Sequence, residues 1–227
     1  MRTALLLGST GLVGGYTLAR LARDPRWTRV VTLDRRPVER ASGTHESHVV
    51  DFDRLDDVPD DVFACDDVFS ALGTTRAQAG SKEAFRRVDL HIPLDVARRA
   101  HAAGATQMLL VSSVSASPES RIFYSRTKGE AEVGVREVGF EAVQIVRPSL
   151  LTGDRTTPRL GERVAETVLG ALRPLLIGPL RNTRPTAGDD VAAALVALAV
   201  ARRPGAHVYD PEAIKAWAAS GSANPSV

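Results

Sequence analysis

The chain has 227 residues, of which 44% are hydrophobic and 25% are charged, and its formal net charge is +2. This length suits one α/β domain with a substantial core, and the composition excludes a low-complexity chain. The basic residues are nearly all arginines scattered among acidic ones, which favours a solvated surface over a nucleic-acid-binding patch.

Short apolar runs alternate with helical patterns along the chain, and runs such as "ALLL" and "MLLV" are typical of strands buried on both faces. The sequence predicts strands at 3–7, 29–33, 47–50, 67–71, 107–111, 142–146 and 206–209. It predicts helices at 12–23, 82–103, 122–138, 160–172, 188–202 and 211–219. This alternation indicates an α/β fold with a doubly wound parallel sheet and helices on both faces. We expect a single domain over 1–227, with a substrate-side segment at 152–187 and a flexible tail at 220–227.

A glycine-punctuated turn, "GSTGLVG", follows the first predicted strand. Gly8 would permit a tight turn, Gly11 the close approach of a pyrophosphate to backbone N–H groups, and Gly14 tight packing of helix on strand. The alternative is an ordinary strand-to-helix loop, and the glycines alone do not decide between the two. The candidate cofactor contacts in this turn are Gly8, Ser9, Thr10, Gly11, Leu12, Val13 and Gly14.

The second predicted strand ends in Asp34, Arg35 and Arg36, where a residue that contacts the adenosine ribose is expected. An acidic residue there favours the free 2′-hydroxyl of NAD, whereas arginines favour the 2′-phosphate of NADP. Two adjacent guanidinium groups fit a phosphate better, so we expect NADP(H), with NAD(H) as the alternative and a merely solvated turn as the third interpretation. Asp51 and Phe52, after the third strand, stand where the edge of an adenine could be recognised.

A candidate catalytic group lies in "VSSVSASPESRIFYSRTKGE", where a strand delivers two serines and a helix follows. Tyr124 and Lys128 are at i and i+4, so both point the same way, and Lys128 is one of only three lysines. A neighbouring ammonium favours the ionised form of a phenol and makes it a better acid–base group. Of Ser112 and Ser113 only one can face the site, and we favour Ser113. Such a Tyr-x-x-x-Lys pair also occurs by chance on amphipathic helices.

Together these elements resemble the extended and atypical branch of the short-chain dehydrogenase/reductase superfamily. Within it the chain is similar to the Tat-interacting-protein-like group of NAD(P)H-binding oxidoreductases. This closer match rests on "LGTTRAQAGSKEAFRRVD" (72–89), "YSRTKGEAE" (124–132) and "VRPSLLTGDR" (146–155). The resemblance implies a Rossmann-type sheet and further cofactor contacts at Ala71, Leu72, Gly73, Thr74, Val111, Lys128, Arg147, Pro148, Ser149, Leu150 and Leu151.

The resemblance also implies that 184–199 forms a closing helix, with Asp189 and Asp190 capping its N-terminus. An arginine pair after the second strand is usual in this group and supports NADP, whereas Asp34 departs from the small residue expected there. Six arginines within 152–187 could clamp an anionic substrate such as a sugar nucleotide, but we favour the interpretation that they are surface residues. A small carbonyl or quinone-like compound suits a chain of this length better.

These patterns predict an NADP(H)-dependent oxidoreductase that transfers hydride to or from a carbonyl or alcohol, with Tyr124 as acid or base. Two alternatives are an NADP(H)-sensing binding protein with little turnover and an NAD-dependent nucleotide-sugar epimerase or dehydratase. The five histidines show no metal-ligand spacing, so we expect no metal site. A homodimer through helix 122–138 is compatible with the sequence.

Localisation is predicted from three negative features of the sequence. Cys65 is the only cysteine, which argues against a disulfide framework. The longest apolar stretch, 191–201, is too short to span a bilayer, and the first strand follows Met1 and Arg2 directly, which leaves no room for a signal peptide. We therefore expect a cytoplasmic protein that binds neither membrane nor nucleic acid.

Overall fold

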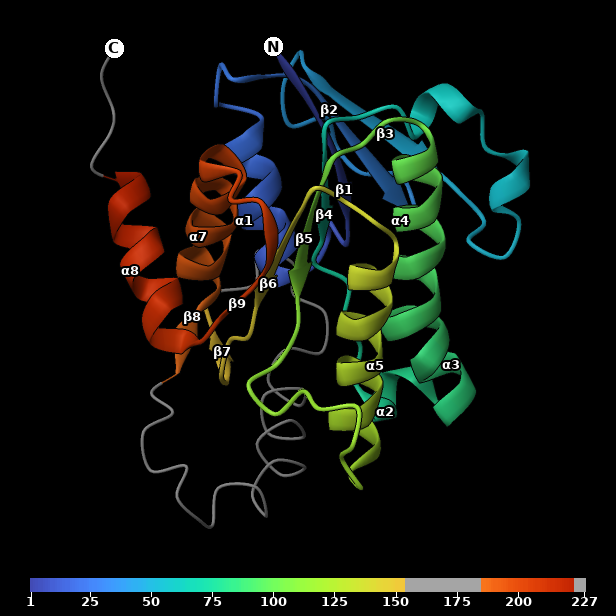
Figure 1. Ribbon diagram of the computed structural model, residues 1–227. Coiled ribbons are helices and arrows are strands. Elements are labelled where there is room, and N and C mark those ends of the chain that lie inside the picture. Colours follow the sequence, from blue (N-terminus) through green and yellow to red (C-terminus); the bar gives the residue numbers. More distant parts are fainter. Residues whose placement is uncertain (154–184, 223–227) are drawn as a thin grey trace.

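A seven-stranded sheet forms the centre of the molecule in the computed structural model, which describes residues 1–153 and 185–222 (Figure 1). The strand order is β3-β2-β1-β4-β5-β6-β9, and each pairing along it is parallel. The chain therefore winds in one direction from β1 to β3 and in the other from β4 to β9, as predicted for a doubly wound sheet. The strands are β1 (Arg2–Leu7), β2 (Trp27–Asp34), β3 (His45–Val49), β4 (Asp67–Ser70), β5 (Gln107–Val111), β6 (Ala142–Val146) and β9 (Gly205–Tyr209).

Helices cover both faces of this sheet (Figure 1). One face carries α1 (Leu12–Leu21), α7 (Gly188–Ala201) and α8 (Pro211–Ser222), and the other carries α4 (Ile92–Ala102) and α5 (Phe123–Glu137). The side chains of successive residues in β1 point alternately to the two faces of the sheet, as strand geometry requires. Leu5 and Leu7 belong to the core under α4 and α5, whereas Leu6 belongs to the core under α1 and α7.

The helix predicted over 82–103 is divided into three parts: α3 (Lys82–Arg86), a π-helical turn (Arg87–His91) and α4. Pro93 explains the division, because its ring has no N–H and would clash with the carbonyl of the residue four positions earlier in a regular α-helix. That residue is Asp89, and the wider π-helical turn accommodates it. The interruption therefore has a local cause that can be seen in the sequence.

Several short elements were not predicted from the sequence. They are α2 (Arg76–Ala79), 3-10 turns at Leu55–Asp57 and Asp60–Val62, and a small parallel pair formed by β7 (Leu151–Thr152) and β8 (Thr186–Ala187). The tail expected from residue 220 is helical as far as Ser222. The helix predicted at 160–172 lies outside the described residues. Across 1–153 and 185–222, no helix is both long and apolar enough to cross a membrane.

A buried ion pair joins the elements at the amino ends of the strands. The Asp67 carboxylate is fully buried, pairs with the Arg2 guanidinium and accepts a hydrogen bond from Trp27 Nε1 at 2.9 Å. Arg2 also donates to Gln107 Oε1 at 3.1 Å and to the Ala199 carbonyl at 2.9 Å. This group of contacts links strands β1, β2, β4 and β5 to α7.

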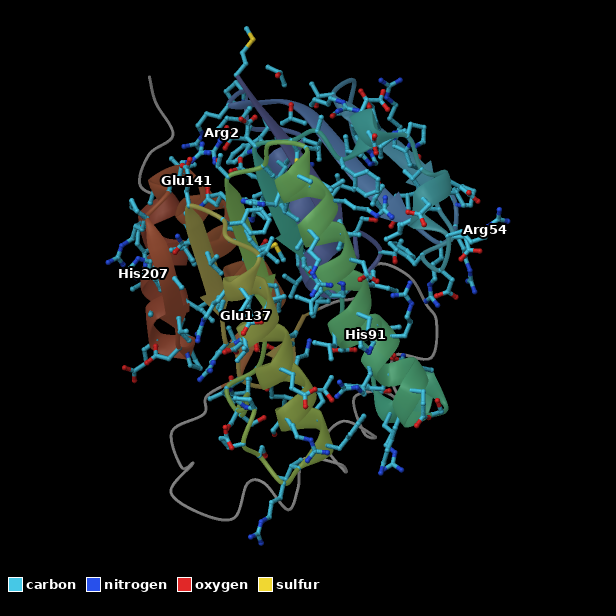
Figure 2. All side chains as sticks on the ribbon, turned by 45° about the vertical axis from the view of Figure 1, so that its right-hand side comes forward. Arg2, Arg54, His91, Glu137, Glu141 and His207 are labelled. Carbon is cyan, nitrogen blue, oxygen red and sulfur yellow. The ribbon has the colours of Figure 1, made fainter. Side chains whose placement is uncertain are left out.

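Replacing Asp67 with Ala should destabilise the protein by about 3–5 kcal/mol, because it leaves the Arg2 charge and the Trp27 N–H without their partner. Urea unfolding measures the free energy of unfolding. Asp57→Ala is the matched control: its partner Arg54 projects from the periphery (Figure 2), the two side chains are 59% and 70% exposed, and the expected change is below about 1 kcal/mol. Equal losses of unfolding free energy in Asp67→Ala and Asp57→Ala would contradict a stabilising role for the buried Asp67 contacts.

Candidate functional site

Most of the predicted site residues gather at the carboxyl edge of the sheet, toward the bottom of Figure 1. They follow β1, β4, β5 and β6, and β1 and β4 are the adjacent strands from which the chain winds in opposite directions. Ligands of open α/β sheets bind in the crevice outside such a switch point. The fold therefore brings the glycine turn and the Tyr124 helix to the same edge.

The glycine turn is shaped by two close backbone approaches. Gly8 has φ +82°, and a Cβ on it would lie 2.8 Å from the carbonyl carbon of Ala71 at the end of β4. A Cβ on Gly14 would lie 1.9 Å from the Gly8 carbonyl oxygen. The N-cap of α1 is Gly11, which supplies no capping side chain, so the helix presents its N-terminal N–H groups without one. This turn, whose helix N-cap carries no side chain, fits a pyrophosphate at the positive end of a helix.

The residues at the end of β2, predicted to contact the ribose, point in two directions: the Asp34 carboxylate is buried, and the two arginines after it are exposed. Asp34 is only 5% exposed; its Oδ1 accepts a hydrogen bond from Ser9 Oγ at 2.6 Å, and its Oδ2 is buried without a hydrogen-bond partner in the described part of the chain. Arg35 and Arg36 are exposed. The hydroxyl of Ser9, one of the predicted cofactor contacts, thus donates to Asp34, whereas Thr10 is exposed.

The two predicted adenine contacts after β3 differ in their exposure. Asp51 is exposed, and its carboxylate accepts a hydrogen bond from the Asp53 N–H at 2.9 Å. Phe52, in contrast, is 7% exposed and packs in the core under α4 and α5. The Phe52 ring therefore packs in the core, and a contact between residues 51–52 and an adenine stays a prediction.

Tyr124 and Lys128 lie one turn apart on α5, as predicted. The Tyr124 ring is half-buried and stands edge-on to Phe85, with 5.9 Å between ring centroids. Lys128 is only 6% exposed, and its Nζ lies 2.7 Å from Asp89 Oδ1. Burial lowers the pKa of Lys128, but the Asp89 carboxylate and the Tyr124 oxygen outweigh it and raise the pKa above its usual value. The ammonium therefore stays charged inside the protein.

The two serines after β5 have different surroundings. Ser112 is buried and donates its hydroxyl to Glu132, which also accepts two hydrogen bonds from the Arg147 guanidinium at 2.8 and 2.6 Å. Ser113 is half-buried, with its Oγ 3.3 Å from Ser115 Oγ. The Ser112 hydroxyl and the Arg147 guanidinium are thus both bonded to Glu132, so Ser113 remains the favoured catalytic serine, and a cofactor contact at Arg147 stays a prediction.

The segment after β6 is fastened to the chain that enters α7. Ser149 and Thr186 share a hydroxyl–hydroxyl hydrogen bond of 2.9 Å, and the Thr186 N–H donates to the Leu150 carbonyl at 2.9 Å. The Pro148 carbonyl accepts from the Val114 N–H at 3.1 Å, and Leu151 is in register with Thr186 in the β7–β8 pair. Sequence reasoning did not predict the part played by fully buried Thr186.

The remaining predicted contacts lie on the carboxyl ends of β4 and β5. Ala71, Leu72 and Thr74 are half-buried and Gly73 is exposed, whereas Val111 is buried at 7% exposure. The six arginines considered as anion clamps lie within 154–184, outside the described residues. In the described ranges, no three His, Cys, Asp or Glu side chains cluster as a metal site would require.

The acidic pair at the start of α7 is not a cap. The N-cap residue is Ala187, and Asp189 and Asp190 stand in the first turn, where their charge complements the helix dipole. Asp189 accepts a hydrogen bond from Arg20 on α1 at 2.7 Å. The predicted capping role is therefore corrected to a contribution of charge and an ion pair between α1 and α7.

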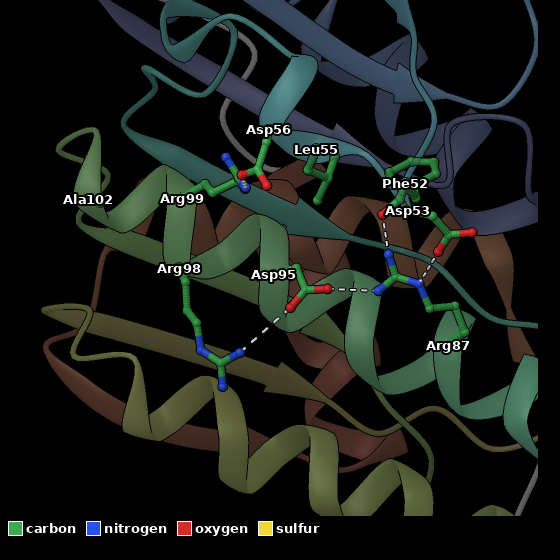
Figure 3. A pocket seen from close by; sticks show the side chains of 9 residues that line it. All are labelled: Phe52, Asp53, Leu55, Asp56, Arg87, Asp95, Arg98, Arg99 and Ala102. Carbon is green, nitrogen blue, oxygen red and sulfur yellow. Dashed lines mark hydrogen bonds and ion pairs between the residues drawn. The ribbon is translucent and has the colours of Figure 1, made fainter.

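A separate hollow of about 460 Å³ lies over α4 (Figure 3). Its arginines already have carboxylate neighbours: Arg87 pairs with Asp53 and Asp95, and Arg99 pairs with Asp56. Of the predicted cofactor contacts, only Phe52 lines it. The hollow is therefore distinct from the edge that carries the glycine turn.

Comparisons with known proteins agree with this geometry. The model of the NAD dependent epimerase/dehydratase family matches residues 4–210. Protein fmp52, mitochondrial, from Emericella nidulans is 37% identical over 178 residues, which cover 76% of each chain. Protein HTATIP2 from Rattus norvegicus is 33% identical over 174 residues, covering 75% of this chain and 72% of that protein. The structure of MoeE5 in complex with UDP-glucose and NAD superimposes with a TM-score of 0.69 at 20% identity, covering 96% of this chain and 81% of that chain, which shows the shared fold.

One prediction is overturned by these relatives. The matched fungal proteins, from Emericella nidulans, Debaryomyces hansenii and Candida albicans, are named as mitochondrial. The expectation of a cytoplasmic protein is therefore wrong. It was drawn from the absence of a secretory signal peptide pattern, of a disulfide framework and of a long apolar stretch, and these features argue only against secretion and membrane insertion.

Gly14→Ala should destabilise the protein by roughly 2–4 kcal/mol, because its methyl group would overlap the Gly8 carbonyl oxygen and force the turn apart. Gly15→Ala is the matched control, since its Cβ would meet only the Ser9 oxygen at 3.4 Å and alanine favours a helix by about 0.5–1 kcal/mol. Thermal unfolding of both variants checks the expectation. A Gly14→Ala variant as stable as the parent would show that the turn does not need this close approach.

Proposed function

Because the chain belongs to the NAD-dependent epimerase/dehydratase family, in the Tat-interacting-protein-like group of short-chain dehydrogenases/reductases, we propose that it is an NADP(H)-dependent oxidoreductase. Its substrate would be a small carbonyl compound or the corresponding alcohol. The observation that carries this proposal is the buried, charged Lys128 ammonium one helical turn from Tyr124. A cofactor sensor would not need a phenol beside a permanent positive charge, whereas an epimerase would use the same pair on the hydroxyl group of its substrate.

Several residues of the chain would hold the cofactor. The N–H groups at the start of α1 and the Gly8 turn would bind the pyrophosphate, and the Pro148–Leu151 segment would lie beside the nicotinamide. When bound, the cofactor supplies or accepts the hydride. Lys128 reaches the same edge of the sheet and would hold the nicotinamide ribose.

The proton is supplied by the protein. In the reductive direction Tyr124 gives its phenolic proton to the substrate oxygen as the carbonyl carbon gains a hydride, which leaves a tyrosinate and an alcohol. Lys128 stabilises the developing negative charge on the phenol oxygen. Ser113 would orient the carbonyl oxygen by donating a hydrogen bond, and its half-buried position supports this role over Ser112.

The preference for NADP(H) over NAD(H) is supported by the arrangement at the end of β2. Asp34 faces inward to Ser9, so its carboxylate is not presented to a ribose diol. Arg35 and Arg36 are exposed beside it and would receive a 2′-phosphate. The engagement of Asp34 with Ser9 and the exposure of the two arginines together support NADP(H).

Arg35→Ala and Arg36→Ala should each weaken NADPH binding by roughly 10- to 100-fold, the effect of losing a charge-assisted contact to phosphate, and should leave NADH binding unchanged. Isothermal titration calorimetry with both cofactors measures this. Arg54→Ala, which removes an exposed guanidinium at the periphery, is the control. If the parent protein binds NADH more tightly than NADPH, Asp34 would be the residue that binds the ribose hydroxyls, and the NADP proposal would be contradicted.

Tyr124→Phe should lower the rate of carbonyl reduction by roughly 100-fold or more, because the proton donor is lost, and should change NADPH affinity little. NADPH consumption with a panel of small aldehydes, ketones and quinones provides the assay. Tyr209→Phe is the control, since its hydroxyl donates to Gln144 within β6 and β9. If the parent protein binds NADPH but reduces none of these compounds, the sensing alternative replaces the enzyme.

A further inference from the structure

The connection from β2 to β3, residues 35–44, begins with Arg35 and Arg36, and we call it the β2–β3 loop. It contains no helix or strand, and its Val38 side chain packs partly against the core under α1 and α7. The placement of the two arginines therefore depends on how the other end of the loop is fastened to the sheet.

His45, the first residue of β3, fastens that end. β3 is the edge strand next to β2 (Figure 1), yet His45 is only 1% exposed. Its Nδ1 accepts a hydrogen bond from the Ala41 N–H of the loop at 3.0 Å. Because Nδ1 is an acceptor, the neutral ring carries its hydrogen on Nε2, which donates to the buried Thr32 Oγ1 at 3.0 Å. The imidazole thus links the loop to β2.

This pair of hydrogen bonds can be made only by the neutral imidazole. A proton on Nδ1 converts the acceptor into a donor that faces the Ala41 N–H, another donor, so the bond to the loop must break. Burial lowers the pKa of His45 below its ordinary value, because water no longer stabilises the charged ring. The ring is therefore neutral at neutral pH and takes up its proton only below about pH 6.5.

We propose that His45 is a positioning residue for the cofactor: its neutral ring holds the β2–β3 loop so that Arg35 and Arg36 receive the phosphate, and its protonation releases the loop and weakens NADPH binding at acidic pH. The inference rests on the proposed function in naming NADPH as the ligand of the two arginines. A released loop must be ordered again when the phosphate binds, and this ordering costs free energy. The loop itself is fastened or released without any cofactor, so the two steps can be tested apart.

The charged groups that face His45 come from three elements. From β2 the Asp34 carboxylate favours the protonated ring, and on β3 Glu46, which is exposed and bonded to Arg29 at 3.0 Å, does so more weakly. From the loop, the Arg40 guanidinium opposes protonation and is held by two carbonyl oxygens of the same loop at 2.9 and 2.7 Å. Desolvation of the ring outweighs the two carboxylates. Once the ring is charged, its repulsion of Arg40 adds to the loss of the Nδ1 hydrogen bond in loosening the loop.

Hydrogen exchange tests the fastening in the full, cofactor-free chain. Exchange of the Ala41 amide is followed between about pH 5.5 and about pH 7.5 and is divided at each pH by the rate of an unstructured peptide. In the parent, protection of this amide should fall by roughly threefold to tenfold toward the acidic end, the factor expected for one hydrogen bond. His45→Asn supplies an amide oxygen in place of Nδ1 and takes up no proton, so its protection should not change with pH.

Calorimetric titration with NADPH over the same pH range tests the effect on the cofactor. The 2′-phosphate itself gains a proton near about pH 6, which weakens binding in every variant alike. Toward the acidic end the parent should weaken by roughly threefold to tenfold more than His45→Asn. His45→Leu, which offers no acceptor, should bind NADPH more weakly than His45→Asn by about the same factor even at neutral pH.

His48→Asn is the matched control. His48 lies on the same strand, but it is half-buried and stands 3.9 Å from the Glu46 carboxylate. Its exchange and binding profiles should reproduce those of the parent. If the His45 variants do not fold, as judged by circular dichroism, the parent alone decides, because the nitrogen NMR signal of the His45 ring and the exchange of the Ala41 amide must then change at one midpoint.

The outcomes separate this inference from the proposed function. Loss of Ala41 protection at acidic pH that is absent in His45→Asn, together with the additional weakening of NADPH binding in the parent, supports it. Protection that does not depend on pH, or equal profiles in the parent and His45→Asn, overturns it. Tighter NADPH binding by the parent than by His45→Asn at acidic pH also overturns it, since the added charge would then act on the phosphate directly. If the parent binds no NADPH, the proposed function fails, whereas the exchange measurement still decides whether His45 fastens the loop.

Discussion

The close approach of the Gly8 turn to the end of β4 is the constraint on which the arrangement of the site depends. There the backbone of one strand–helix connection touches the adjacent strand with no side chain between them. The contact sets where α1 begins, and α1 in turn packs against α7, which is joined to the segment after β6 through Thr186. A side chain larger than hydrogen at Gly8 or Gly14 would push this turn away from β4 and from the start of α5 across the crevice.

Buried carboxylates then join elements that are distant in the sequence. Asp67 joins four strands to α7 at the amino edge of the sheet, while Asp89 joins the loop after β4 to α5 at the carboxyl edge. Glu132 joins α5 to the ends of β5 and β6 through Ser112 and Arg147. Each lies opposite a cation, which is the condition under which ionised groups are stable inside a protein. In a sheet assembled only from parallel strands, these cross-links supplement the apolar cores on either face.

The sheet was predictable because its strands are continuous apolar runs bounded by turns, and each predicted strand is present within one to two residues of its ends. The glycine turn and the Tyr124–Lys128 pair were also predictable, since their spacing in the sequence is itself the geometric requirement.

The errors concern side chains whose direction depends on packing. The sequence does not show that Phe52 faces the core or that Ser112 turns to Glu132. Asp89 was not predicted as a site residue because its inward direction depends on the π-helical turn, for which Pro93 within a helical pattern was the available signal.

The short β7–β8 pair has a consequence for how proteins of this architecture diverge. The chain leaves the sheet edge at Thr152 and returns at Thr186, and these two points are fastened side by side by the Ser149–Thr186 and Leu150–Thr186 hydrogen bonds. The cost of closing a segment between fixed ends grows only slowly with its length. Sequence between these anchors can therefore be lengthened, shortened or replaced during evolution without moving the cofactor turn or the Tyr124 helix. For the proposed reductase, selectivity for different substrates could thus be acquired as an independent module on an unchanged chemical core.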